Sequence, residues 1–199
     1  MSLRKHQSTP QLISSARRLR LFSLGEEVNG SVIGLKRVVV QDPKAFVREI
    51  QEKFPSLIIQ VVESRFIGGL THARLTMQQS WESRKRQLTF ARKPDLDLLL
   101  RIALGTQISE ALKRVGVRRG TVDLAILAMG PPHDLQMLHE YCKKTWTVND
   151  EVIALSKRKE KFLRKFHGIT EESTKTTTIK EEVLAYLLSE RAALLGVRM

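Results

Sequence analysis

The sequence predicts a single α/β domain: a small mixed β-sheet flanked by helices, with a helical C-terminal extension. Strand-like stretches alternate with stretches of helical periodicity between residues 31 and 142, which is typical of layered α/β folds. The chain has 199 residues, 42% of them hydrophobic, enough for one core and unlike a disordered chain. We expect residues 31–199 to form this domain and residues 1–30 to form a mobile basic arm. The first 24 residues are Arg- and Ser-rich without acids and so also resemble a mitochondrial presequence, but the equally basic remainder favours the arm.

The first half of the domain alternates strands and helices. Residues 31–40, "SVIGLKRVVV", have the β-branched composition of a strand, and a second strand is expected over residues 56–62. The helix between them begins with Asp42 as its N-cap and Pro43 in its first position. Residues 69–87 have apolar residues at helical spacing. Residues 95–104, "DLDLLLRIAL", predict a covered central strand, because short continuous apolar runs are typical of such strands.

A short helix with a basic outer face is expected to follow this run. Ile108, Ala111, Leu112 and Val115 have the spacing of one buried helical face, with Thr106 as the cap. A glycine at 116 suits a left-handed C-terminal residue, and the N–H groups of residues 105–107 would be free to bind an anion. A strand (122–129), a helix (134–142), a basic helical stretch (153–166), a polar linker (167–178) and a final helix (179–197) complete the chain.

The charge of the chain favours a polyanionic partner. The net charge is +13, and 20 of the 34 cations fall in four clusters, at residues 4–20, 84–93, 113–119 and 157–165. Such a field attracts nucleic acid at long range. The alternative is a basic protein with ordinary solvated faces, for example from a thermophile.

No catalytic constellation is visible in the sequence. The motifs GxxxxGK[ST], GxGxxG, GxSxG and HExxH are absent, and no carboxylate pair stands out for acid–base work. Cys142 is the single cysteine and the five histidines are scattered, so we expect no disulfide, metal site or cofactor. No apolar stretch approaches the roughly 20 residues of a membrane-spanning helix. We expect a cytoplasmic protein that is not an enzyme.

The segment 97–117, "DLLLRIALGTQISEALKRVGV", resembles the kinase-binding regulatory subunit, of the CGI type, of the KEOPS complex. That family has an apolar strand, a polar turn and then a segment similar to "ISEAL". The similarity extends to "FLRKFHGIT" at 162–170 and covers roughly residues 32–197. Arg92 matches a basic position of the family, whereas Thr106 stands where many archaeal members have arginine.

The resemblance implies a non-catalytic subunit. KEOPS makes threonylcarbamoyl-adenosine in tRNAs, and the family member docks on the N-lobe of the complex's small protein kinase, stimulates it, and helps recruit tRNA through the 3′ CCA end. Its partners would be the KEOPS kinase, tRNA and, indirectly, the other KEOPS subunits. Two alternatives remain: a stand-alone basic RNA-binding domain, or an enzyme with an unrecognised site.

Two sets of residues are candidates for these contacts. The final helix has more apolar residues than one buried stripe needs, so part of it is expected to contact the kinase. Burial between two layers of its own domain, or homodimerisation, would explain the same pattern. The expected partner-binding residues are Val183, Leu184, Leu187, Leu188, Leu194 and Leu195, and the expected RNA-binding residues are Arg92, Thr106, Gln107, Lys113, Arg114, Arg118 and Arg119.

Overall fold

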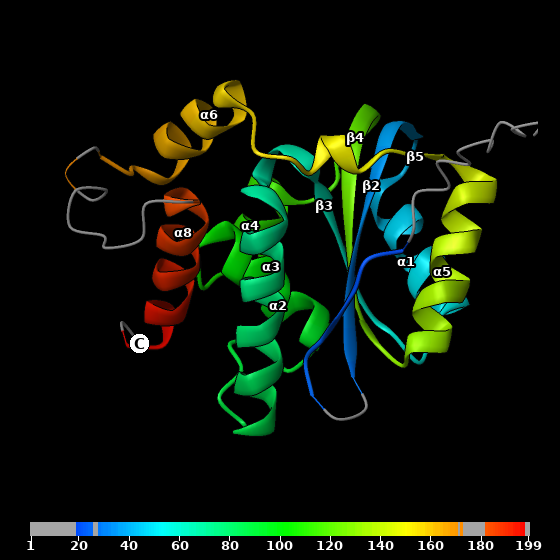
Figure 1. The fold of residues 1–199 in the computed structure, drawn as a ribbon, viewed down its shortest axis with the longest axis horizontal. Coiled ribbons are helices and arrows are strands. Elements are labelled where there is room, and N and C mark those ends of the chain that lie inside the picture. Colours follow the sequence, from blue (N-terminus) through cyan, green and yellow to red (C-terminus); the bar gives the residue numbers. More distant parts are fainter. Residues whose placement is uncertain (1–18, 26–27, 171, 173–181, 198–199) are drawn as a thin grey trace, which may run out of the picture.

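The computed structural model describes residues 19–25, 28–170, 172 and 182–197. A sheet of five strands lies at its centre, in the order β1-β2-β4-β3, with β5 also paired to β2 (Figure 1). The strands are β1 (Leu21–Ser23), β2 (Asn29–Val40), β3 (Ile58–Glu63), β4 (Gly120–Gly130) and β5 (Thr147–Val148). The single α/β domain is therefore confirmed. Most of the expected arm, residues 1–18, lies outside the described residues, but the sheet already begins at Leu21.

The pairing of the sheet differs from the expected mixed pattern. Every described strand pair is antiparallel. Strand β4 inserts between β2 and β3 and runs opposite to both. One edge of the sheet is thus β3, which pairs only with β4 among the described strands.

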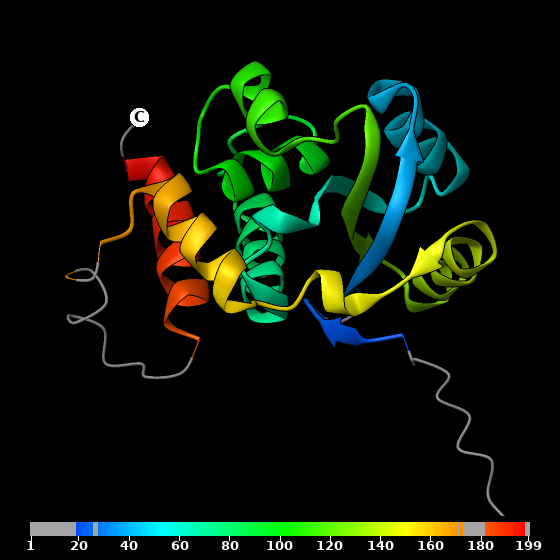
Figure 2. The same cartoon turned by 90° about the horizontal axis from the view of Figure 1, so that it is seen from above.

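Helices cover both faces of the sheet (Figures 1 and 2). Helices α1 (Pro43–Lys53) and α5 (Pro132–Thr145) pack on one face, around Ile33, Ile59 and Ile126. Helices α2 (Gly69–Lys85), α3 (Pro94–Ala103) and α4 (Ile108–Val115) pack on the other, together with the 3-10 helix η1 (Ser64–Phe66). Helices α6 (Lys157–His167) and α8 (Val183–Ala193) form an outer layer beyond α2, and 3-10 turns occur at η2 (Asp150–Val152) and η3 (Leu194–Val197).

The strand predicted over residues 95–104 is wrong, because this segment is helix α3. Pro94 occupies its first turn, and two acidic residues, Asp95 and Asp97, lie there as well, where the helix dipole favours them. All residues from Asp97 to Ala103 are buried. A helix covered on every side has the same continuous apolar run as a covered strand, which explains the error.

Two details of α4 also differ from expectation. Its N-cap is Gln107, not Thr106, and Gly116 has φ −64°, so it is not left-handed. Ala111 and Val115 are buried, but Ile108 and Leu112 are 37% and 46% exposed. Helix α4 therefore presents apolar side chains to solvent.

Candidate nucleic-acid interface

The predicted RNA-binding residues form two groups, one at each end of α4. Thr106 and Gln107 are exposed at its beginning, whereas Arg118 and Arg119 are exposed beyond its end. With a rise of 1.5 Å per residue, the two ends of this eight-residue helix lie about 12 Å apart. The N–H of Gly105 donates to the carbonyl of Leu100 at 3.1 Å, so it is not free to bind an anion.

The start of α3, which Arg92 precedes, lies beside the later end of α4. Helices α3 and α4 form a hairpin, and Leu96 at the start of α3 lines the same groove as Lys113 near the end of α4. Arg92 is exposed just before α3. Lys113 is exposed as well, and its amine lies 3.0 Å from the carboxylate of Glu110.

A buried carboxylate binds two arginines near the end of α4. Glu63, with a side chain only 6% exposed at the end of β3, accepts hydrogen bonds from Arg118 through both of its oxygens, one of them at 2.9 Å. Nε of Arg65 lies 3.0 Å from the same carboxylate. The hydrogen bonds to Glu63 raise the pKa of Arg118. Two guanidinium groups share one negative charge, so the cluster keeps a positive surplus.

Phenylalanines of α6 extend this cluster. The guanidinium of Arg114 lies 4.8 Å from the ring centroid of Phe166, and that of Arg65 lies 5.3 Å from Phe162. The rings of Phe162 and Phe166 are stacked, with centroids 5.6 Å apart. Arginine planes combined with partly exposed aromatic rings are what single-stranded RNA contacts by stacking and phosphate binding. We name Arg65, Arg114, Arg118, Phe162 and Phe166 the Arg–Phe surface.

Sequence reasoning missed three of the five residues of this surface, Arg65, Phe162 and Phe166. Arg65 lies in η1, outside the four clusters of cations, and the sequence gives it no role. Phe162 and Phe166 stand four residues apart in the most basic helix, and this spacing was the available signal. Lys161 and Lys165 are exposed on the same helix.

The expected partner-binding leucines of the final helix are mostly core. Leu184, Leu187, Leu188 and Leu195 are each at most 8% exposed. The first three pack with Leu163 of α6 in a cluster of their own. The structure thus matches the alternative that the helix is buried within its own domain. Of the six residues, Val183 is half-buried and Leu194 is 44% exposed.

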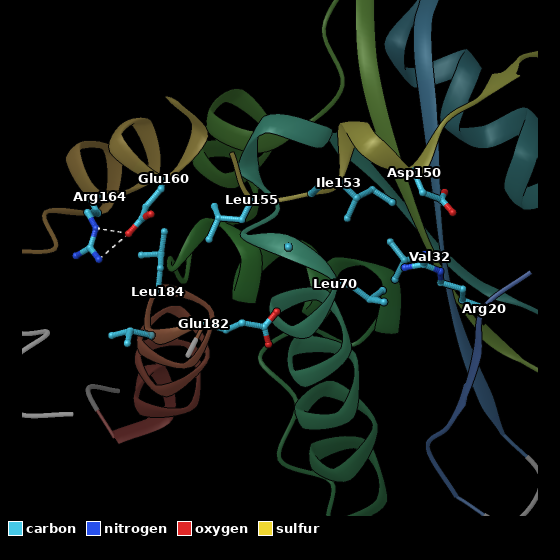
Figure 3. Close-up of a pocket in the computed structure, with 13 residues that line it drawn as sticks. Arg20, Val32, Leu70, Asp150, Ile153, Leu155, Glu160, Arg164, Glu182 and Leu184 are labelled. Atoms are coloured by element: carbon cyan, nitrogen blue, oxygen red, sulfur yellow. Dashed lines mark hydrogen bonds and ion pairs between the residues drawn. The ribbon is translucent and has the colours of Figure 1, made fainter. Parts of the chain in front are cut away.

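A cavity of about 640 Å³ lies between the start of α2, η2, α6 and the start of α8 (Figure 3). Its three carboxylates are already engaged: Asp150 accepts the N–H of Gly34, Glu160 pairs with Arg164, and Glu182 accepts the hydroxyl of Thr71. The contacts of Asp150 and Glu182 join different elements of the fold, and the pair of Glu160 with Arg164 lies within α6. Within the described part of the chain, no group of three or more His, Cys, Asp or Glu residues could hold a metal ion. Nor is any helix there long and apolar enough to cross a membrane.

Comparison with protein families gives a match over most of the chain. A family model described as "Kinase binding protein CGI-121" matches residues 38–191, from the last residues of β2 to the last turn of α8. No curated protein matches the chain.

Proposed function

Because the chain belongs to the CGI-121 family of kinase-binding proteins, we propose that it is the kinase-binding subunit of a KEOPS complex. In this role it binds and stimulates the small protein kinase and helps recruit tRNA through the 3′ CCA end for threonylcarbamoyl-adenosine modification. The match over residues 38–191 is the observation that carries the proposal, since it includes the helices on both faces of the sheet and strands β3, β4 and β5.

The tRNA part of the proposal is supported by the Arg–Phe surface. Its three arginines come from η1, α4 and the segment after α4, and its two phenylalanines come from α6. Cations that track phosphates and rings that stack on unpaired bases suit a single-stranded end of RNA better than a duplex. We propose that Arg92, Lys113 and Arg119 extend the contact along the RNA backbone, with Thr106 and Gln107 more distant.

A non-catalytic role is supported by the engaged state of the carboxylates. In the cavity of Figure 3 each acid already has a hydrogen-bonding or ionic partner within the fold. A general base needs an accessible position beside its substrate. We therefore assign this cavity a structural role.

The direct test mixes the purified chain with the KEOPS kinase of the same organism. We expect the two to elute together from a size-exclusion column, and the ATPase rate of the kinase to rise when the chain is added. The chain alone should not hydrolyse ATP.

Other results would select an alternative function. A chain that binds tRNA but neither binds nor stimulates the kinase is a stand-alone RNA-binding domain. ATP hydrolysis or RNA cleavage by the chain alone would identify an enzyme.

A further inference from the structure

A groove of about 520 Å³ follows the outer edge of β3, between α1 and α4. Its floor is aliphatic, with Val47 from α1, Val61 from β3, Leu96 from α3 and Leu112 from α4. Leu112 is 46% exposed, and Ile108, one turn earlier on α4, is 37% exposed. We call this the β3-edge groove.

Five cations and one acid line the β3-edge groove. The acid, Asp95, accepts a hydrogen bond from Gln51 at 3.2 Å. Arg118 pairs with the buried Glu63, and two other cations have exposed acidic neighbours, since Arg48 lies 3.9 Å from Glu52 and Lys113 lies near Glu110. Exposed pairs of this kind contribute little and leave the field of the groove positive. The cations are Lys44, Arg48, Lys113, Arg118 and Arg119.

The groove does not offer an open strand edge. The side-chain amide of Gln51 donates to the carbonyl of Ile59, and that of Gln60 donates to the carbonyl of Val61, both at 2.8 Å. Gly116 forms a bridge to Val62 farther along. An added strand would have to break these contacts. The groove is therefore shaped to receive side chains.

We propose that the β3-edge groove binds a segment of the partner kinase in which acidic residues flank large apolar side chains. This inference rests on the proposed function. The apolar side chains would cover Leu112 and the floor, and the acidic ones would meet Lys44 and Arg48 on the α1 wall.

The positive charge of the groove disfavours two other occupants, and the absence of aromatic rings from its lining disfavours a third. Residues 1–18 contain Arg4, Lys5, Arg17 and Arg18 and no acid, so they are repelled. A second copy of the chain carries the same charge of +13. RNA would find phosphate partners but no aromatic ring among the lining residues, in contrast to the Arg–Phe surface.

The first test replaces the exposed leucine of the groove. Leu112→Asp should weaken kinase binding about tenfold or more, because it places a carboxylate against the apolar part of the partner. The matched control is Met137→Asp on α5, which is also a half-exposed apolar residue, at 53%, but lies on the opposite face of the sheet. It should bind like the wild type. Circular dichroism of both variants checks that they are folded.

The second test reverses charge on the α1 wall. Lys44→Glu with Arg48→Glu should weaken kinase binding by a similar factor and flatten its dependence on salt. Lys44 lies in the first turn of α1, where the helix dipole favours a glutamate, and circular dichroism checks that the double variant is folded. Binding to tRNA should stay near the wild-type affinity.

A photo-crosslinking residue at position 112 tests the predicted chemistry of the partner. Mass spectrometry should place the cross-link in a kinase segment that contains Asp or Glu beside large apolar residues. Normal kinase binding by both groove variants overturns the inference, as does a loss of tRNA binding with intact kinase binding. The same holds if Leu194→Asp on the outer layer abolishes kinase binding and Leu112→Asp does not. If the wild-type chain itself does not bind the kinase, the proposed function fails as well.

Discussion

At the scale of single residues, two buried histidines make the free energy of unfolding depend on pH. Nδ1 of His72 accepts the N–H of Gly68 at 3.0 Å. Burial lowers the pKa of His72 to about 3, and burial lowers that of His167 to about 4, with nearby cations adding to both shifts. Nε2 of each ring has no hydrogen-bond partner among the described residues. Both rings are therefore neutral in the folded protein at pH 7.

We expect the free energy of unfolding to fall as the pH drops below about 6.5. The pKa of each histidine is lower in the folded chain than in the unfolded one, so the unfolded chain binds more protons. The contribution of the two histidines to the free energy of unfolding is fully present above pH 6.5 and is lost as the pH falls to between 3 and 4. For His72 the free energy of unfolding falls by up to about 1.4 kcal/mol per pH unit. Urea titrations at pH 7 and pH 5 measure the free energy of unfolding. His72→Leu should flatten the dependence, whereas His133→Gln, at an exposed position, should not. Equal slopes in all three proteins would contradict this account.

At the scale of elements, the sequence predicts those helices and strands that have one apolar side and one polar side. Helix α1 begins as expected, with the side chain of Asp42 accepting the N–H groups of Lys44 and Ala45. Helix α3 could not be predicted from its apolar pattern, because it is covered on every side; the useful signal was Asp97 and Arg101, spaced i,i+4. The same limit applies to the Arg–Phe surface. The cations of α4 could be predicted, but Arg65 comes from a distant segment that only the tertiary fold brings near.

The buried pair in α3 gives a second stability prediction. The carboxylate of Asp97 accepts hydrogen bonds from Arg101 (2.8 Å), the hydroxyl of Ser80 (2.6 Å) and the N–H of Phe90 (2.7 Å). Asp97→Ala leaves the guanidinium of Arg101 buried without its charge partner, which should cost about 3–5 kcal/mol in urea unfolding. Adding Arg101→Met should recover part of this loss, since it removes the isolated charge. Glu110→Ala, which breaks an exposed pair, should cost less than about 1 kcal/mol. A double variant less stable than Asp97→Ala would show that the pair is not the cause.

At the scale of the whole molecule, the net charge of +13 raises the question of whether tRNA binding depends on total charge or on one surface. Counter-ion release predicts that the logarithm of the affinity falls linearly with the logarithm of salt concentration, by about 0.7 per phosphate neutralised on a single strand. If Arg65 and Arg114 each neutralise a phosphate, Arg65→Gln with Arg114→Gln should reduce the slope by about 1.4. The control, Lys143→Gln with Lys144→Gln, removes the same charge from α5, on the opposite face of the sheet.

The two double variants separate the local effect from the global one. Both have a net charge lower by two, so any effect of total charge on long-range attraction is equal in them. Only the first removes guanidinium groups that lie beside the rings of Phe162 and Phe166, where a bound strand would stack. We therefore expect the first to lose both affinity and slope, and the control to follow the wild-type line, in fluorescence-anisotropy titrations over a range of salt concentrations. If both variants change the slope equally, tRNA is held by the overall field of the chain, and the Arg–Phe surface is not its binding site.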